Sequence, residues 1–218
     1  MIKVVIFDLD GTLLDSSRPI SMSWRHTMET LVGRGITDEE IRLTMGEMLI
    51  DSMRRMMPEV EAEYALDFYR TYQRGIFLDQ IYLYDGAEDV LRTLKEAGYK
   101  NLLLTSRLNS STFRALDKFG ITGLFDAVLT ASESKKFKPD PGPVLEILEM
   151  IGAGPEEAIM IGDTGHDIEA GKAAGVFTVL VDWSLALPPG EAREEAPAPD
   201  AIIEKLSDVP ALLDKLNS

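Results

Sequence analysis

Short apolar runs recur through the second half of the chain and once at its start, and segments with helical periodicity separate them. Runs of this kind, bounded by polar or turn-forming residues, predict strands buried in a parallel sheet. The expected strands cover residues 3–7, 101–106, 126–131, 158–162, 176–182 and 201–203, and a stretch rich in Pro, Ala and Glu at 185–199 predicts a surface loop. Because strands alternate with helices, the pattern predicts an α/β fold, a Rossmann-like parallel sheet with helices on both faces.

A helical block interrupts this pattern after the first strand. Its residues 35–40, GITDEE, carry the cap candidate and the acidic first turn of a helix start. The opening strand has no helix partner nearby, so we assign it to the later sheet. The expected organisation is a core of residues 1–15 and 84–218, with a small all-helical cap domain of residues 16–83 inserted after the first strand.

Polar side chains follow the expected strands at their carboxyl ends, where open parallel sheets bind ligands. Asp8 and Asp10 stand two residues apart after the first strand, and side chains at that spacing on a strand share one face. Lys138 lies in a segment that two prolines make rigid. The other candidates are Thr105 and Ser106, which follow the strand expected at 101–106, and Asp163 and Asp167, which follow the strand expected at 158–162.

This group of aspartates is costly unless something offsets its charge. Two ionised carboxylates about 4 Å apart repel by roughly 4 kcal/mol at an effective dielectric of about 20, equivalent to about 3 pKa units. Either one aspartate is protonated or a divalent cation lies among them, and both can hold. Since the chain has no cysteine and two histidines, the expected ion is oxygen-bound, such as Mg²⁺. A cation, a hydroxyl and a lysine together favour a phosphoryl site, in which an aspartate can be the nucleophile.

Charge and hydropathy exclude other classes of partner. The net charge of −15 over 218 residues, without a basic stripe, argues against binding to nucleic acid or to an anionic membrane. No stretch approaches the roughly 20 apolar residues of a membrane span. The chain opens on a strand rather than a signal-peptide pattern. We therefore expect a cytoplasmic protein, whose oligomeric state the residues do not indicate.

Four motifs together carry a resemblance to a known family. In order, they are DLDGTLLDS, LLLTS, KPDP and IGDTGHDIEAGKAAG. The chain resembles the haloacid dehalogenase superfamily of phosphatases along essentially its whole length, and the phosphoglycolate phosphatase-like branch shares its DGTLLDS wording. The resemblance implies a phosphoric monoester hydrolase that uses Mg²⁺, acts on a small phosphorylated metabolite and closes a helical cap over the site.

The resemblance also implies roles for the motif residues. Asp8 would attack phosphorus, while Asp10 would protonate the leaving oxygen and later take a proton from the hydrolytic water. Thr105, the backbone around Ser106, and Lys138 would bind the phosphoryl oxygens.

Metal binding is implied in the same way. Mg²⁺ would be held by Asp163, the Asp8 carboxylate and the backbone carbonyl of Asp10. Asp167 would orient a metal-bound water or only cap a helix. Asp10 also favours phosphoryl transfer over dehalogenation, because the family's dehalogenases lack this second aspartate and halide needs no proton on leaving.

Substrate contacts are expected from the cap and from the second motif. The turn at residues 44–47 is the candidate cap loop, with Gly46 and Glu47 as substrate residues. Arg107 departs from the Asn or small residue expected after the second motif, and it is either a second phosphate contact or an exposed side chain.

Several alternatives stay open at this point. One is pyrophosphate hydrolysis, and another is β-phosphoglucomutase-like transfer, which the Ile20 found in place of that enzyme's histidine disfavours. A signalling receiver domain also gathers aspartates, a hydroxyl and a lysine around Mg²⁺, but its phosphorylated aspartate comes later in the chain and it has no helical insertion. An inactive family member acting as a binding partner is disfavoured, because every motif residue is present.

Overall fold

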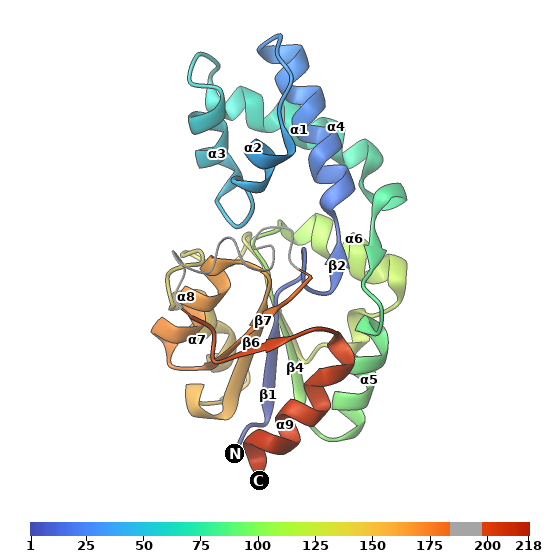
Figure 1. The fold of residues 1–218 in the computed structure, drawn as a ribbon, viewed down its shortest axis with the longest axis vertical. Coiled ribbons are helices and arrows are strands. Elements are labelled where there is room, and N and C mark those ends of the chain that lie inside the picture. Colours follow the sequence, from blue (N-terminus) through green and yellow to red (C-terminus); the bar gives the residue numbers. More distant parts are fainter. Residues whose placement is uncertain (184–197) are drawn as a thin grey trace.

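The sheet lies at the centre of the protein, which is known from a computed structural model that describes residues 1–183 and 198–218 (Figure 1). Its strands are β1 (Val4–Phe7), β4 (Lys100–Leu104), β5 (Ala127–Leu129), β6 (Ala158–Gly162), β7 (Phe177–Val181) and β8 (Ala201–Ile203). Within these described residues the sheet has six strands in the order β5-β4-β1-β6-β7-β8, and every neighbouring pair is parallel. The predicted parallel sheet is confirmed, with β1 at its middle.

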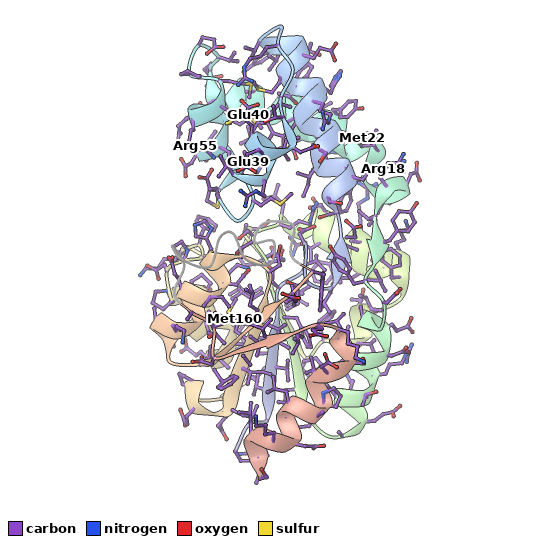
Figure 2. The ribbon with its side chains drawn as sticks, in the orientation of Figure 1. Arg18, Met22, Glu39, Glu40, Arg55 and Met160 are labelled. Carbon is purple, nitrogen blue, oxygen red and sulfur yellow. The ribbon has the colours of Figure 1, made fainter. Side chains whose placement is uncertain are left out.

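Two apolar layers cover the sheet. Val5 and Phe7 belong to a buried cluster shared with α5 (Ala87–Glu96), α6 (Asn109–Phe119) and α9 (Val209–Asn217). Val4 and Ile6 belong to a second cluster shared with α7 (Gly142–Glu149) and α8 (Gly165–Ala174), which also contains Met160, labelled in Figure 2. Alternate residues of one strand therefore enter opposite layers, as the pleat requires. The prediction of helices on both faces is confirmed.

Residues 17–80 build a separate helical group beyond the carboxyl ends of the strands (Figure 1). Its helices are α1 (Ser17–Leu31), α2 (Asp38–Arg42), α3 (Leu49–Met56) and α4 (Ala62–Gln80). They share an apolar cluster of their own, where the rings of Trp24 and Tyr69 meet edge to face at 5.4 Å. Thr37 caps α2 in a capping box with Glu40. The division into core and cap domains stays a prediction, which this separate cluster supports.

An antiparallel ribbon joins the helical group to the sheet. β2 (Leu14–Asp15) pairs with β3 (Tyr82–Leu83), so the segment that leads into the helical group and the segment that leads out of it lie side by side. The apolar pattern did not predict this ribbon, because two-residue strands are too short to show a period. Short 3-10 helices lie at Thr122–Leu124, Pro155–Glu157 and Leu206–Asp208.

β1 ends at Phe7, where the apolar pattern placed its end, so Asp8 and Asp10 lie in the loop that follows. β4 ends at Leu104, earlier than the pattern indicated, so Thr105 also lies in a loop. Because Asp8 and Asp10 lie outside β1, strand alternation does not determine which way their side chains face. The loop expected at 185–199 lies, up to residue 197, outside the described residues. No helix in the described part of the chain has both the length and the apolar character to cross a bilayer.

Candidate active site

A cavity of about 510 Å³ opens between the carboxyl end of the sheet and the helical group. The residues predicted for the site all line it: Asp8, Asp10, Gly46, Glu47, Thr105, Ser106, Arg107, Lys138, Asp163 and Asp167. The fold thus brings together side chains from the whole length of the chain. Their presence in one cavity leaves their individual roles as proposals.

The loop after β1 turns sharply at Gly11, where φ is +85°. The backbone N–H of Gly11 donates to the carbonyl of Leu14 at 2.8 Å, which closes the turn. A Cβ atom at Gly11 would lie 2.1 Å from Oδ2 of Asp163, closer than real atoms approach. Glycine is required here for its backbone angle and its small size, and it lets the β1 loop lie directly against Asp163.

Lys138 is the buried cation of the site. Its Nζ donates to Oδ1 of Asp8 at 2.5 Å and to Oδ1 of Asp167 at 2.6 Å. All three side chains are at most 9% exposed. We call Asp8, Lys138, Asp163 and Asp167 the catalytic floor. A buried charge needs a partner of this kind, because desolvation is costly.

Asp167 has two structural tasks. Besides accepting from Lys138, it forms a capping box with Thr164 at the start of α8, and its Oδ2 accepts from the Thr164 backbone N–H and hydroxyl. The expectation that Asp167 caps a helix agrees with this geometry. Its ion pair with Lys138 was not predicted, because the two residues are far apart in the chain.

Burial controls the protonation of the floor. Burial raises the pKa of Asp8 to about 7, with Lys138 opposing the rise and Asp167 adding to it. Burial, followed by the charges of Asp8 and Asp167, also raises the pKa of Asp163 well above its usual range. Burial alone would lower the pKa of Lys138, but the two aspartates outweigh it and raise that pKa. With all three aspartates ionised, the floor would carry more negative charge than one lysine offsets, and the raised pKa values of Asp8 and Asp163 reflect this.

The floor fits a divalent cation. One carboxylate oxygen from each of Asp8, Asp163 and Asp167 lies within 4.8 Å of the other two, and all three residues are buried. Both oxygens of Asp167 already accept hydrogen bonds. Oδ2 of Asp8, to which no described residue donates, is therefore a better candidate than either oxygen of Asp167, and Asp163 is the other buried carboxylate beside it. An all-oxygen donor set is what a hard cation prefers.

Arg107 holds Asp10 in a two-pronged ion pair. Its Nε donates to Oδ2 of Asp10 and its Nη2 to Oδ1, both at 2.8 Å. The guanidinium carbon lies 4.1 Å from the centre of the Phe77 ring, and the Arg107 side chain is 9% exposed. The alternative of an exposed Arg107 is therefore wrong. The expectation of a substrate contact stays a prediction, since in this structure the guanidinium binds the aspartate.

Thr105 and Ser106 differ in their environments. Thr105 is buried, its N–H donates to the carbonyl of Leu129, and its hydroxyl accepts from the backbone N–H of Arg107. Ser106 is exposed and lines the cavity. No acceptor in the described residues takes the Ser106 backbone N–H, which leaves it available to an anion.

The predicted cap loop reaches the sheet side of the cavity. Gly46 has φ of +84°, and a Cβ there would lie 2.7 Å from Nδ1 of His166 in α8. Glu47, in contrast, accepts from Arg55 and from the Ser52 hydroxyl, both at 2.7 Å. The loop therefore touches the core through Gly46, while Glu47 is engaged within the helical group.

Three arginines complete the cavity lining. Arg70 and Arg74 come from α4 and Arg114 comes from α6; we call these three the arginine rim. The four-residue spacing of Arg70 and Arg74 places them on one helix face, but neither was singled out from the other cap arginines. Tyr69 and Phe77 on the same helix were also missed, because their spacing is that of any apolar helix face.

Comparisons with known proteins agree with this geometry. A family model for haloacid dehalogenase-like hydrolases matches residues 5–181. Pyrophosphatase PpaX of Bacillus cereus (strain G9842) is 32% identical over 216 residues, covering 99% of this chain and 98% of the relative. A haloacid dehalogenase-like hydrolase of Streptococcus pneumoniae has a TM-score of 0.85 at 25% identity, over 97% of this chain and 98% of its own.

A more distant structure shares the fold. The predicted phosphoglycolate phosphatase of Haemophilus somnus 129PT has a TM-score of 0.83 at 23% identity, over 97% of this chain and 98% of its own. The family match removes the receiver alternative. With the four motifs on the sheet that such enzymes use, the chain belongs to the haloacid dehalogenase-like hydrolase family and is an enzyme of its phosphatase group.

Proposed function

We propose that the chain is a Mg²⁺-dependent phosphatase that hydrolyses a small phosphate ester through an aspartyl-phosphate on Asp8. The observation that carries this is the floor itself. Asp8 is buried at the open end of the sheet, is held at 2.5 Å by Lys138 and lies beside a second buried aspartate. A positioned carboxylate with a nearby cation is the arrangement that phosphoryl transfer needs, because catalysis depends on alignment and charge neutralisation.

The reaction takes two displacements. In the first, a carboxylate oxygen of Asp8 bonds to phosphorus, the bond from phosphorus to the leaving oxygen breaks, and Asp10 gives that oxygen a proton. In the second, water bonds to phosphorus, Asp10 takes a proton from it, and the acyl phosphate bond breaks. Phosphate leaves and Asp8 and Asp10 are restored.

The remaining residues of the site bind and orient the substrate and the metal ion. Lys138 neutralises charge on Asp8 and on the phosphoryl oxygens, while the Thr105 hydroxyl and the Ser106 backbone N–H hold those oxygens. Asp163, Asp8 and the Asp10 carbonyl would bind Mg²⁺, which supplies charge neutralisation when present. Asp167 positions Lys138.

The substrate class is a small phosphorylated metabolite. A phosphoglycolate-like ester is the first candidate, because the first motif has the sequence DGTLLDS that the phosphoglycolate phosphatase-like branch shares. Pyrophosphate is the second, since relatives named pyrophosphatase match over 99% of this chain.

A substrate screen with a nucleophile variant tests the proposal. We expect Mg²⁺-dependent release of phosphate from at least one of phosphoglycolate, sugar phosphates, nucleotides and pyrophosphate. Asp8→Asn should reduce this release by at least about 10³-fold, because an amide oxygen cannot displace the leaving group. The control is Asp214→Asn, an exposed change on α9. Full activity of Asp8→Asn would contradict the mechanism.

A further inference from the structure

Asp10 is not available for proton transfer in this structure. Arg107 binds both of its carboxylate oxygens at 2.8 Å. A two-pronged guanidinium–carboxylate pair is stronger than an ordinary hydrogen bond. The Phe77 ring, 4.1 Å away, also covers one face of the guanidinium. Before Asp10 can reach a leaving oxygen, its side chain must turn out of this pair.

A group that replaces Asp10 on Arg107 would have to be anionic. A neutral group would leave the largely buried guanidinium without a counterion, which is costly. The phosphoryl group itself is assigned to Lys138 on the floor and to the backbone N–H of Ser106. The counterion for Arg107 must therefore come from the other part of the substrate, the leaving group.

The arginine rim points to the same chemistry. Most other arginines of the described chain are ion-paired: Arg25, Arg34, Arg42, Arg54, Arg55 and Arg92. Among the described residues, none of the three rim arginines has an ion-pair partner within 4.0 Å. Burial lowers the pKa of Arg70, with the Asp67 carboxylate opposing the shift and the Arg74 charge adding to it. In a chain with a net charge of −15, cations without counterions collect around this cavity.

We propose that Arg107 selects substrates whose leaving group carries a second anionic group, a carboxylate or a second phosphate. That group takes the guanidinium from Asp10, and the freed Asp10 carboxylate then takes up a proton from solvent, which it gives to the leaving oxygen. The rim arginines attract the same group to the mouth of the cavity. Binding and activation are thereby linked, because a substrate without the second anion leaves Asp10 in its ion pair. This proposal rests on the proposed phosphatase function.

Matched substrates test the selection. Phenyl phosphate and 4-carboxyphenyl phosphate differ by one carboxylate, and pyrophosphate supplies the second phosphate. The wild-type enzyme should have a higher kcat/KM for 4-carboxyphenyl phosphate and pyrophosphate, which carry a second anionic group, than for phenyl phosphate. Arg107→Gln should reduce that preference about 10- to 100-fold, the range for a charged hydrogen bond. The substitution should raise KM for the two substrates with a second anionic group and raise kcat for phenyl phosphate.

Two further variants separate selection from support of the fold. Arg107→Lys keeps the charge but cannot form the two-pronged pair, so its preference should fall between those of the wild type and Arg107→Gln. Arg92→Gln removes an exposed ion pair on α5 and should leave the preference unchanged. If Arg107→Gln lowers the preference for 4-carboxyphenyl phosphate but not that for pyrophosphate, the second anionic group is a carboxylate. If it lowers only the preference for pyrophosphate, that group is a phosphate.

Other results would overturn the proposal. One is a wild-type enzyme that has no preference for either anionic substrate. Another is an Arg107→Gln variant that loses activity equally on all three substrates, since Arg107 would then only support Asp10. No Mg²⁺-dependent hydrolysis of any phosphate compound by the wild type would instead contradict the proposed phosphatase function itself.

Discussion

At the catalytic floor, Lys138 donates to both Asp8 and Asp167, and each of these groups is at least nine-tenths buried. At the arginine rim, by contrast, Arg70, Arg74 and Arg114 have no ion-pair partner among the described residues and lie closer to solvent. The floor has the arrangement that the proposed reaction needs, whereas the rim has charges that no described residue neutralises. We therefore propose that chemistry and recognition are divided between two sides of one cavity, with Arg107 between them.

The largest effect should come from removing the cation of the floor. Lys138→Met leaves three buried carboxylates without their lysine, so we expect a loss of about 3–5 kcal/mol in the free energy of unfolding and no measurable turnover. Urea denaturation and phosphate release measure the two effects. Lys136→Met, which removes an exposed pair with Asp140, is the matched control and should behave like the wild type. A stable, active Lys138→Met variant would contradict the assigned role of the lysine.

Gly11→Ala should disturb the floor without changing a charge. The new Cβ would meet Oδ2 of Asp163 at 2.1 Å, and the positive φ adds about 1–2 kcal/mol of strain. We expect the Mg²⁺ concentration for half-maximal activity to rise at least about 10-fold. Gly75→Ala on α4 meets nothing within 4 Å and should stabilise its helix slightly. An unchanged metal titration in Gly11→Ala would show that Asp163 does not bind the metal.

Protonation of the floor gives a smaller, pH-dependent effect. Since the pKa of Asp8 rises from 3.8 to about 7 on folding, the folded protein binds more protons than the unfolded chain between these values. Metal-free stability should therefore fall as the pH rises through this window. Mg²⁺ should raise Tm more at about pH 8 than at about pH 5, because it offsets the ionised carboxylates. An equal rise in Tm on adding Mg²⁺ at both pH values would argue against a raised pKa of Asp8. Asp163→Asn should reduce the difference between the two Tm shifts.

The rim should give the smallest effect. Arg70→Gln, at a partly solvated site, should raise KM for an anionic substrate about 3- to 10-fold, with a smaller change in kcat, because it acts before the chemical step. Arg18→Gln, an exposed change on α1 outside the cavity lining, is the control. A KM effect of Arg18→Gln as large as that of Arg70→Gln would indicate a general charge effect instead of a local one.

The two regions also differ in how far the sequence predicted them. Asp8 and Asp163 were found because each directly follows an apolar strand, and parallel strands bring their carboxyl ends to one edge. The pair of Arg107 and Asp10 joins residues 97 positions apart through a long side chain, and no local pattern reports such a contact. The β2–β3 ribbon was not predicted for a similar reason, because the paired residues Leu14 and Leu83 are separated in the chain by the whole helical group.

Trapping the intermediate tests the central claim most directly. Borohydride reduces an acyl phosphate to an alcohol, so quenching the enzyme during turnover with Mg²⁺ and substrate should convert the aspartate at position 8 to homoserine. Peptide mass spectrometry identifies the residue, with Asp8→Asn and substrate-free enzyme as controls. Phosphoryl transfer through Asp8 predicts homoserine at position 8 and at no other aspartate. Reduction at Asp10 or Asp163, or none during confirmed turnover, would contradict it.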